Sequence, residues 1–185
     1  MRILILALFL QALSFGADNP TAFSLMKEGN RYVGEQAKDR VVQVRSEKSV
    51  GGLNPTIWYV VYYDPTATFK AVEVKFGGGK MMDVKRPFRV IESVSSSGKE
   101  MDKEKLKVDS DKAIGMAVKE PVLENLEVRA VQAKLENSNS GPVWIIKLWA
   151  TKLKNRNETA DLGEITYSAD DGKIIKNDIH PDRVD

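Results

Sequence analysis

The residues of this chain that could do chemistry are few, and His180 is its only histidine. It lies in a polar C-terminal segment, and the chain has no cysteine. A zinc site or a Ser-His-Asp arrangement would therefore have to be built around a residue of the tail, where chains are seldom well ordered. We predict no catalytic residue, no bound metal and no cofactor, and we expect that the protein is not an enzyme.

Two acidic pairs could supply oxygen ligands to calcium, namely Asp170 with Asp171 and Glu158 with Asp161. Neither pair has the spacing of a known calcium loop. Acidic residues at turns commonly form and solvate the turn, so we expect these pairs to be turn formers.

Two strands rich in aromatic residues supply the candidate binding residues. Because side chains alternate along a strand, each strand presents two sets. One set, expected to form the core, comprises Trp58, Val60, Tyr62, Trp144, Ile146 and Leu148. The other set is either an interface between the two halves of the chain or a surface that receives a partner. Its candidate partner residues are Tyr59, Val61, Tyr63, Lys147 and Trp149.

The elements that must position these side chains occur twice in the same order. Asn19 caps a helix that begins at Pro20, and its apolar face extends to Ala37. Ser110 caps a second helix, which ends at Pro121. Strands are predicted at residues 40–47, 56–64, 69–76 and 80–85, and again at 126–135, 142–153 and 163–170.

The two halves also match residue by residue at three places. Trp58–Tyr63 matches Trp144–Trp149, Gly79–Met82 matches Gly172–Ile175, and Ala22-Phe23 matches Ala113-Ile114. Matches in a fixed order indicate duplication of a structural unit. The predicted fold is α+β, with two repeats of a helix packed on a three- to four-stranded antiparallel sheet. The repeats span residues 17–86 and 107–185, with a linker at 87–106.

The second half resembles a PepSY domain. The resemblance rests on the stretches SDKAIGMA, PVWIIKL and GEITYSADDGKIIKND, the last ending at Asp178. The first half resembles the family more weakly, since it has GGG at residues 77–79 where the second half has DDG. This resemblance implies a non-catalytic unit found in secreted and envelope proteins, for which inhibition or regulation of peptidases has been proposed.

The closing motif of each half is interpreted as a structural turn. Asp170, Asp171 and Gly172 are residue types that tolerate a positive φ, and the aliphatic residues after Lys173 return to the sheet. Gly77–Gly79 lacks the Lys-Ser/Thr ending of a phosphate-binding loop, so we predict a hairpin turn there as well.

The N-terminus predicts export from the cytoplasm. Arg2 precedes an apolar run from Ile3 to Leu13, and Ser14 and Gly16 suit cleavage after Gly16. The run is shorter than the roughly 20 residues that span a bilayer. Residues 1–16 are therefore predicted to be a signal peptide, and the protein is expected to be secreted or periplasmic, with no stable membrane span after processing.

The charge composition argues against nucleic acid as a partner. The 28 basic and 26 acidic residues nearly cancel, so no broad positive field favours nucleic acid as a partner. The first hypothesis is a non-enzymatic module that binds a protein or an extended peptide, with a peptidase as the suspected partner. The alternative is an envelope carrier of a small apolar ligand or lipid, in a cleft between two sheets lined by Tyr59, Tyr63 and Trp149.

Overall fold

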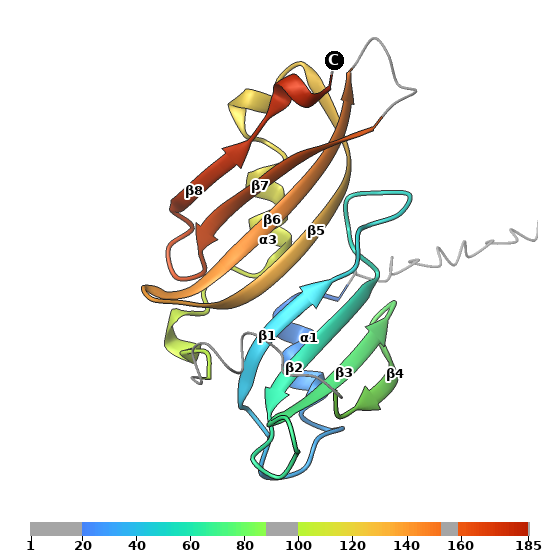
Figure 1. Cartoon of the computed structure of the whole chain (residues 1–185), viewed down its shortest axis with the longest axis vertical. Helices are drawn as coiled ribbons and strands as arrows, with labels where there is room; N and C mark the ends of the chain where they lie inside the picture. Colours follow the sequence, from blue (N-terminus) through green and yellow to red (C-terminus); the bar gives the residue numbers. More distant parts are fainter. Residues whose placement is uncertain (1–19, 88–99, 153–158, 185) are drawn as a thin grey trace, which may run out of the picture.

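The computed structural model describes residues 20–87, 100–152 and 159–184 of the chain (Figure 1). The predicted signal peptide and most of the predicted linker lie outside these residues. No helix of the described structure is long and apolar enough to cross a membrane.

The described chain contains two short α-helices, eight strands and three turns of 3₁₀ helix. The helices are α1 (Ala22–Gly29) and α3 (Ser110–Ala117). The strands of the first half are β1 (Val41–Ser46), β2 (Ile57–Tyr63), β3 (Ala71–Gly77) and β4 (Lys80–Lys85). Those of the second half are β5 (Leu126–Ser138), β6 (Gly141–Lys152), β7 (Ala160–Ser168) and β8 (Ile174–Ile179). The 3₁₀ turns are η1 (Lys103–Lys105), η2 (Pro121–Leu123) and η3 (Pro181–Arg183).

All eight strands belong to one antiparallel sheet, in the order β4-β3-β2-β1-β5-β6-β7-β8. The two halves join where β1 pairs with β5, and Val44 lies opposite Leu135 at the centre of this join. The predicted fold of two repeats, each a helix on its own small sheet, is therefore wrong. Pairing of β1 with β5 satisfies backbone groups that would otherwise be left at the edge of each smaller sheet.

Both helices lie on the same face of the sheet, which we call the helix face (Figure 1). One hydrophobic core lies between these helices and the sheet, and it contains buried residues of both halves. Trp58 and Trp144 are 2% and 0% exposed, which confirms the expected core set. Their indole nitrogens donate hydrogen bonds to the carbonyl oxygens of Pro55 and Val108, so neither ring leaves a polar atom unsatisfied.

The N-termini of the two helices share their capping groups. Asp109, rather than the predicted Ser110, is the N-cap of α3, and its Oδ1 accepts from the backbone N–H of Ser110. The same oxygen accepts from the N–H of Phe23 at 3.1 Å, and Ser110 Oγ accepts from the N–H of Ala22 at 2.9 Å. The first N–H groups of α1 are thus satisfied by residues more than 80 positions later in the chain.

Helix α1 is shorter than predicted. It begins after Thr21, whose Oγ1 accepts from the N–H of Ser24, whereas the predicted cap at Asn19 lies outside the described residues. It ends at Gly29, so the predicted apolar face at Val33 and Ala37 is not helical. Both side chains are nevertheless buried in the common core, because the chain after α1 also packs on the sheet.

The two edge strands have the same local design. Gly79 (φ 79°) and Gly172 (φ 73°) hold the turns before β4 and β8, as the turn motif predicted. Each edge strand carries a β-bulge after its turn. On β4 the bulge lies where the register with β3 shifts, between Lys75 and Phe76 of β3. On β8 it lies where the register with β7 shifts, between Thr166 and Tyr167 of β7. The aliphatic pair that follows each turn is exposed rather than buried.

Candidate functional site

The predicted partner residues lie on the face of the sheet opposite the helices, which we call the outer face. Figure 1 views the molecule from this side, with both helices behind the strands. Tyr59 and Tyr63 lie on β2, and Trp149 lies on β6, with the strands β1 and β5 between them. All three rings are partly exposed, so they are available to a partner.

A cation lies over each of these rings. The guanidinium of Arg40 is 4.5 Å from the centre of the Tyr63 ring, and that of Arg45 is 4.4 Å from the Tyr59 ring. The ammonium of Lys48 is 4.3 Å from the Trp149 ring. Such contacts fix the orientation of a ring at a solvated surface. The three aromatic side chains are therefore held in place before any partner arrives.

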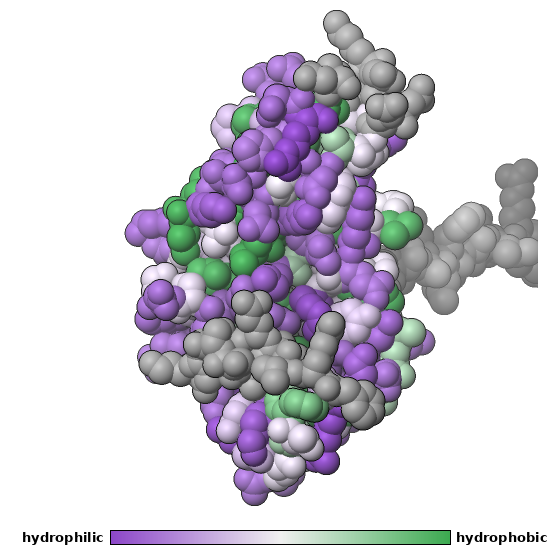
Figure 2. Space-filling model, viewed as in Figure 1, coloured by the Kyte–Doolittle hydropathy of each residue, from purple (hydrophilic) through white to green (hydrophobic). Residues whose placement is uncertain are grey.

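Tyr59 is held most firmly. Its ring also contacts Lys75 at 5.2 Å, and its hydroxyl donates to Glu47 Oε1. Its hydrogen bond with Lys75 and the nearby Glu47 raise the pKa of that lysine despite some desolvation. Arg45 in turn binds the buried carboxylate of Glu73 at 2.6 Å. These contacts make a network in which basic and acidic groups balance, and Figure 2 shows hydrophilic residues over most of this face with apolar patches between them.

The other two predicted partner residues have different surroundings. Val61 is fully buried, in a small second cluster with Val42, Ala71 and the ring of Tyr63. It supports the outer face but cannot contact a partner. Lys147 lies 5.3 Å from the Trp149 ring and forms a 2.7 Å ion pair with Asp161, so it positions the tryptophan.

The ion pair with Lys147 also lowers the pKa of Asp161. Partial burial raises the pKa of this carboxyl group, but the bonds from Lys147 and from the N–H of Gly163 outweigh burial and hold the pKa below its usual range. Asp161, expected to form a turn, lies on β7 and neutralises a lysine. Its predicted companion Glu158 lies outside the described residues.

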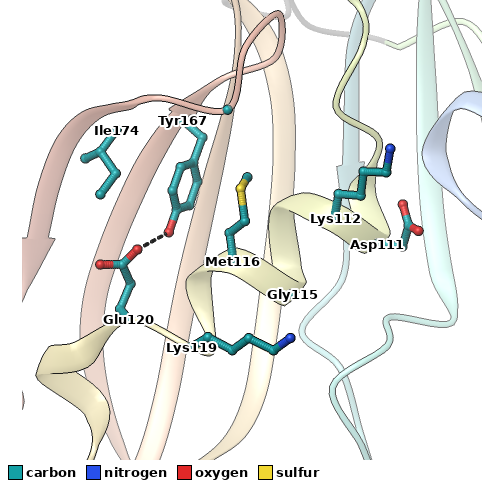
Figure 3. Close-up of a pocket in the computed structure, with 9 residues that line it drawn as sticks. Asp111, Lys112, Gly115, Met116, Lys119, Glu120, Tyr167 and Ile174 are labelled. Carbon is teal, nitrogen blue, oxygen red and sulfur yellow. Dashed lines mark hydrogen bonds between the residues drawn. The ribbon is translucent and has the colours of Figure 1, made fainter.

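A groove lies on the helix face, between α3 and the edge strand β8 (Figure 3). Its volume is about 740 Å³, and Met116, Tyr167 and Ile174 supply its apolar lining. The hydroxyl of Tyr167 donates to Glu120 Oε1 at 2.7 Å. Burial first, and then this bond, raise the pKa of Tyr167 above its usual range. The groove exists because α3 covers β5 and β6 and stops short of β8.

The other residues considered for chemistry have structural surroundings. His180 Nε2 lies 3.1 Å from Asp178 Oδ1. Asp171 accepts from the N–H of Lys173 and also forms an ion pair with its ammonium group, which lowers the pKa of Asp171 to about 2. Asp170 pairs with Lys107 at 2.6 Å. These aspartates stabilise the turn before β8.

The sequence did not reveal the groove or the free edge beside it. Met116 appeared only as a helical residue, and Tyr167 as a strand residue within the closing motif. The exposed Ile174 and Ile175 were expected to return to the sheet, which they do, but at its edge. A signal was present in the polar residues that follow them, because a final strand reading Lys-Asn-Asp is too polar for the interior of a sheet.

Comparisons with protein-family models, curated proteins and solved structures gave no match. The resemblance of the second half to PepSY domains therefore stays a prediction.

Proposed function

We propose that the protein is a secreted or periplasmic binding module that contacts another protein through its outer face, and that it acts without catalysing a reaction. The observation that supports this proposal is the set of three partly exposed aromatic rings, Tyr59, Tyr63 and Trp149, each oriented by a cation. Tyrosine, tryptophan and arginine are the residue types that contribute most binding energy at protein interfaces.

The preformed state of the rings favours binding over a purely structural role. A ring already fixed by Arg40, Arg45 or Lys48 loses little conformational freedom when a partner covers it. The balanced charges of the face favour a partner surface of mixed charge, rather than one of a single sign. The PepSY resemblance makes a peptidase the first class of partner to test.

The carrier alternative has less support. It required a cleft between two sheets, and the strands form one sheet. Tyr59, Tyr63 and Trp149, which were to line the cleft, lie on the outer face of that sheet.

The test is inhibition and binding measured with a panel of purified secreted peptidases of the serine and metallo classes, followed by photo-crosslinking in the exported fraction if none responds. For a partner so found, purified and shown to bind directly, Tyr59→Ala and Trp149→Ala should each weaken binding about tenfold or more. Each variant should keep most of the stability of the parent, because the rings are only partly buried.

The matched control is Val122→Ala, which shortens an exposed apolar side chain in η2, the turn that follows helix α3. It should leave the affinity unchanged. If folded Tyr59→Ala and Trp149→Ala variants bind the purified partner as tightly as the parent chain, the outer face is not the contact surface and the proposal is wrong.

A further inference from the structure

The edge strand β8 has backbone groups without partners in the described sheet. The N–H of His180 donates to the carbonyl of Leu162 at 2.7 Å. In an antiparallel pair, alternate residues direct their backbone groups to the same neighbouring strand. Lys176 and Asp178 therefore direct theirs toward β7, whereas Asn177 and Ile179 direct theirs toward the free edge. There the N–H of Ile179 donates to the exposed side-chain Oδ1 of Asn177 at 3.2 Å, a contact that a neighbouring strand would replace.

The described part of the chain leaves this edge open. After β8 it turns back over β7, where η3 packs and Arg183 Nη1 reaches the carbonyl of Asp161 at 3.5 Å. Figure 1 shows β8 at the border of the sheet, with no labelled element beyond it. At the start of the strand, Ile174 and Ile175 are 49% and 52% exposed. An open edge with exposed aliphatic residues is a template for pairing with another strand.

The order of residues in β8 is complementary to itself. If a second copy is placed antiparallel so that Asn177 lies opposite Asn177, then Lys176 lies opposite Asp178 of the second copy, and Asp178 opposite its Lys176. Ile175 then lies opposite Ile179 of the second copy. Opposite charges and apolar pairs directly across a strand pair are each stabilising. In this register the backbone groups of Asn177 and Ile179 would bond to the second copy. These are the residues that direct their backbone groups to the free edge.

We propose that β8 pairs with β8 of a second copy of this chain, on a two-fold axis at Asn177, and so continues the sheet across a homodimer. The proposal is independent of the outer face and of any partner bound there. Within one chain, Lys176 and Asp178 already form a 3.2 Å ion pair, but their side chains are 61% and 48% exposed. Such an exposed pair contributes little, so exchanging it for a pair across the dimer costs little.

The opposite edge strand, β4, fits a second copy less well. It also alternates charges, at Asp83 and Lys85. Lys85, however, is bound at 3.2 Å to the carboxylate of Glu73, which is 3% exposed. Removing that lysine would weaken the neutralisation of a buried acid, which is costly.

The groove beside β8 adds apolar contact to the proposed dimer. Ile174 lines the groove between α3 and β8 and is the neighbour of Ile175 in the bulge (Figure 3). Ile179 of the second copy, opposite Ile175, would therefore lie beside this isoleucine and reduce its exposure to water. Burial of exposed aliphatic side chains favours association.

The test is sedimentation equilibrium of the full processed chain up to about 1 mM, since a contact made mainly by one strand is small and its dimer is expected to be weak. The parent chain should dimerise. Lys176→Glu alone and Asp178→Lys alone place like charges opposite each other twice in the dimer, and each should weaken dimerisation about tenfold or more. An equimolar mixture of these two variants restores both opposite-charge pairs and should dimerise about as well as the parent.

Two further variants make the test specific. Asn177→Pro removes an N–H that the pairing with β7 does not use, together with the exposed side-chain oxygen that accepts from the N–H of Ile179. It should abolish the dimer and lower the melting temperature only slightly. Lys134→Glu and Glu136→Lys repeat the charge changes at the same spacing in the interior strand β5, where their side chains form a 2.9 Å ion pair. Neither should affect dimerisation.

A parent chain that stays monomeric at about 1 mM would overturn the proposal. So would a dimer that persists in Asn177→Pro, or a mixture of Lys176→Glu and Asp178→Lys that associates no better than either variant alone. A monomeric parent would assign the free edge to water or to an extended peptide, and a dimer that these variants do not change would use another surface, such as β4 of the other copy.

Discussion

Gly172 stabilises the turn before β8 through its backbone conformation. Its φ is 73°, and a Cβ added there would lie 3.4 Å or more from its neighbours, the nearest being Met116 Sδ. Space is therefore available, and the constraint is conformational. We expect Gly172→Val to lower the free energy of unfolding by about 1 to 3 kcal/mol, the usual cost of a strained backbone position.

The comparison variant is Asp171→Asn. Its side chain keeps an oxygen that can accept from the N–H of Lys173, and it loses only an exposed ion pair. Thermal unfolding should show a clearly larger fall in melting temperature for Gly172→Val, at about 2 to 4 °C per kcal/mol for a chain of this size. Equal melting temperatures would contradict the role assigned to the turn.

Single residues of the outer face could be predicted only in part. Alternation along β2 and β6 placed Tyr59, Tyr63 and Trp149 on one face, and the structure agrees. The sequence did not show that Arg40 and Lys48 lie over two of these rings, because each cation comes from a segment whose path depends on the pairing of β1.

At the scale of elements, Asp109 stabilises two helices at once. Its Oδ1 accepts from the N–H groups of Phe23 and Ser110, at 3.1 and 2.6 Å. Replacement by alanine leaves both donors without this acceptor, at the positive ends of both helices. We expect Asp109→Ala to destabilise the protein by about 1 to 3 kcal/mol, measured by urea denaturation.

Two control variants separate this effect from loss of an ordinary surface carboxylate. Asp109→Asn retains an acceptor and should cost less than Asp109→Ala. Asp102→Ala removes a side chain that caps only the short turn η1, by accepting from the N–H of Glu104. Should Asp102→Ala cost as much as Asp109→Ala, the shared cap would have no special importance.

The sequence predicted most strands within a few residues, because β-branched and aromatic residues alternate clearly in them. The strand predicted at residues 56–64, for example, is Ile57–Tyr63 in the structure. Helix ends were less predictable. The end of α1 was misplaced because Val33 and Ala37 continue an apolar spacing that the chain satisfies by packing without a helix.

At the scale of the whole molecule, Trp58 and Trp144 test whether the two halves unfold together. Both belong to the same core, although they lie in different halves. Trp58→Ala and Trp144→Ala should each destabilise by about 3 to 5 kcal/mol, because each opens a large cavity in a packed interior. Since the sheet and the core are continuous, each substitution should lower one common unfolding transition.

Calorimetry, together with far-UV circular dichroism and tryptophan fluorescence, measures this directly. Coincident transitions in all three signals indicate a single cooperative unit. If Trp58→Ala splits the melting curve and leaves a second transition at the parent temperature, the halves unfold independently.

The overall architecture was the part that the sequence could not predict. Internal similarity indicated two copies of one unit but contained no information on how the copies meet. Val44 pairs with Leu135 through backbone groups, and backbone groups are the same in every residue. The choice between two separate sheets and one continuous sheet depends on the final packing of both halves, as does the free edge at β8.

The pairing of β1 with β5 has a consequence for how the chain folds. Its three registered pairs join residues 43–45 to residues 134–136, far apart in the sequence. Closing so long a loop is entropically costly, whereas the hairpins on either side close short loops. We therefore expect the hairpins to form first and the join last. Until then each half exposes an unpaired inner strand, and a newly made chain is at that stage able to exchange halves with a neighbour.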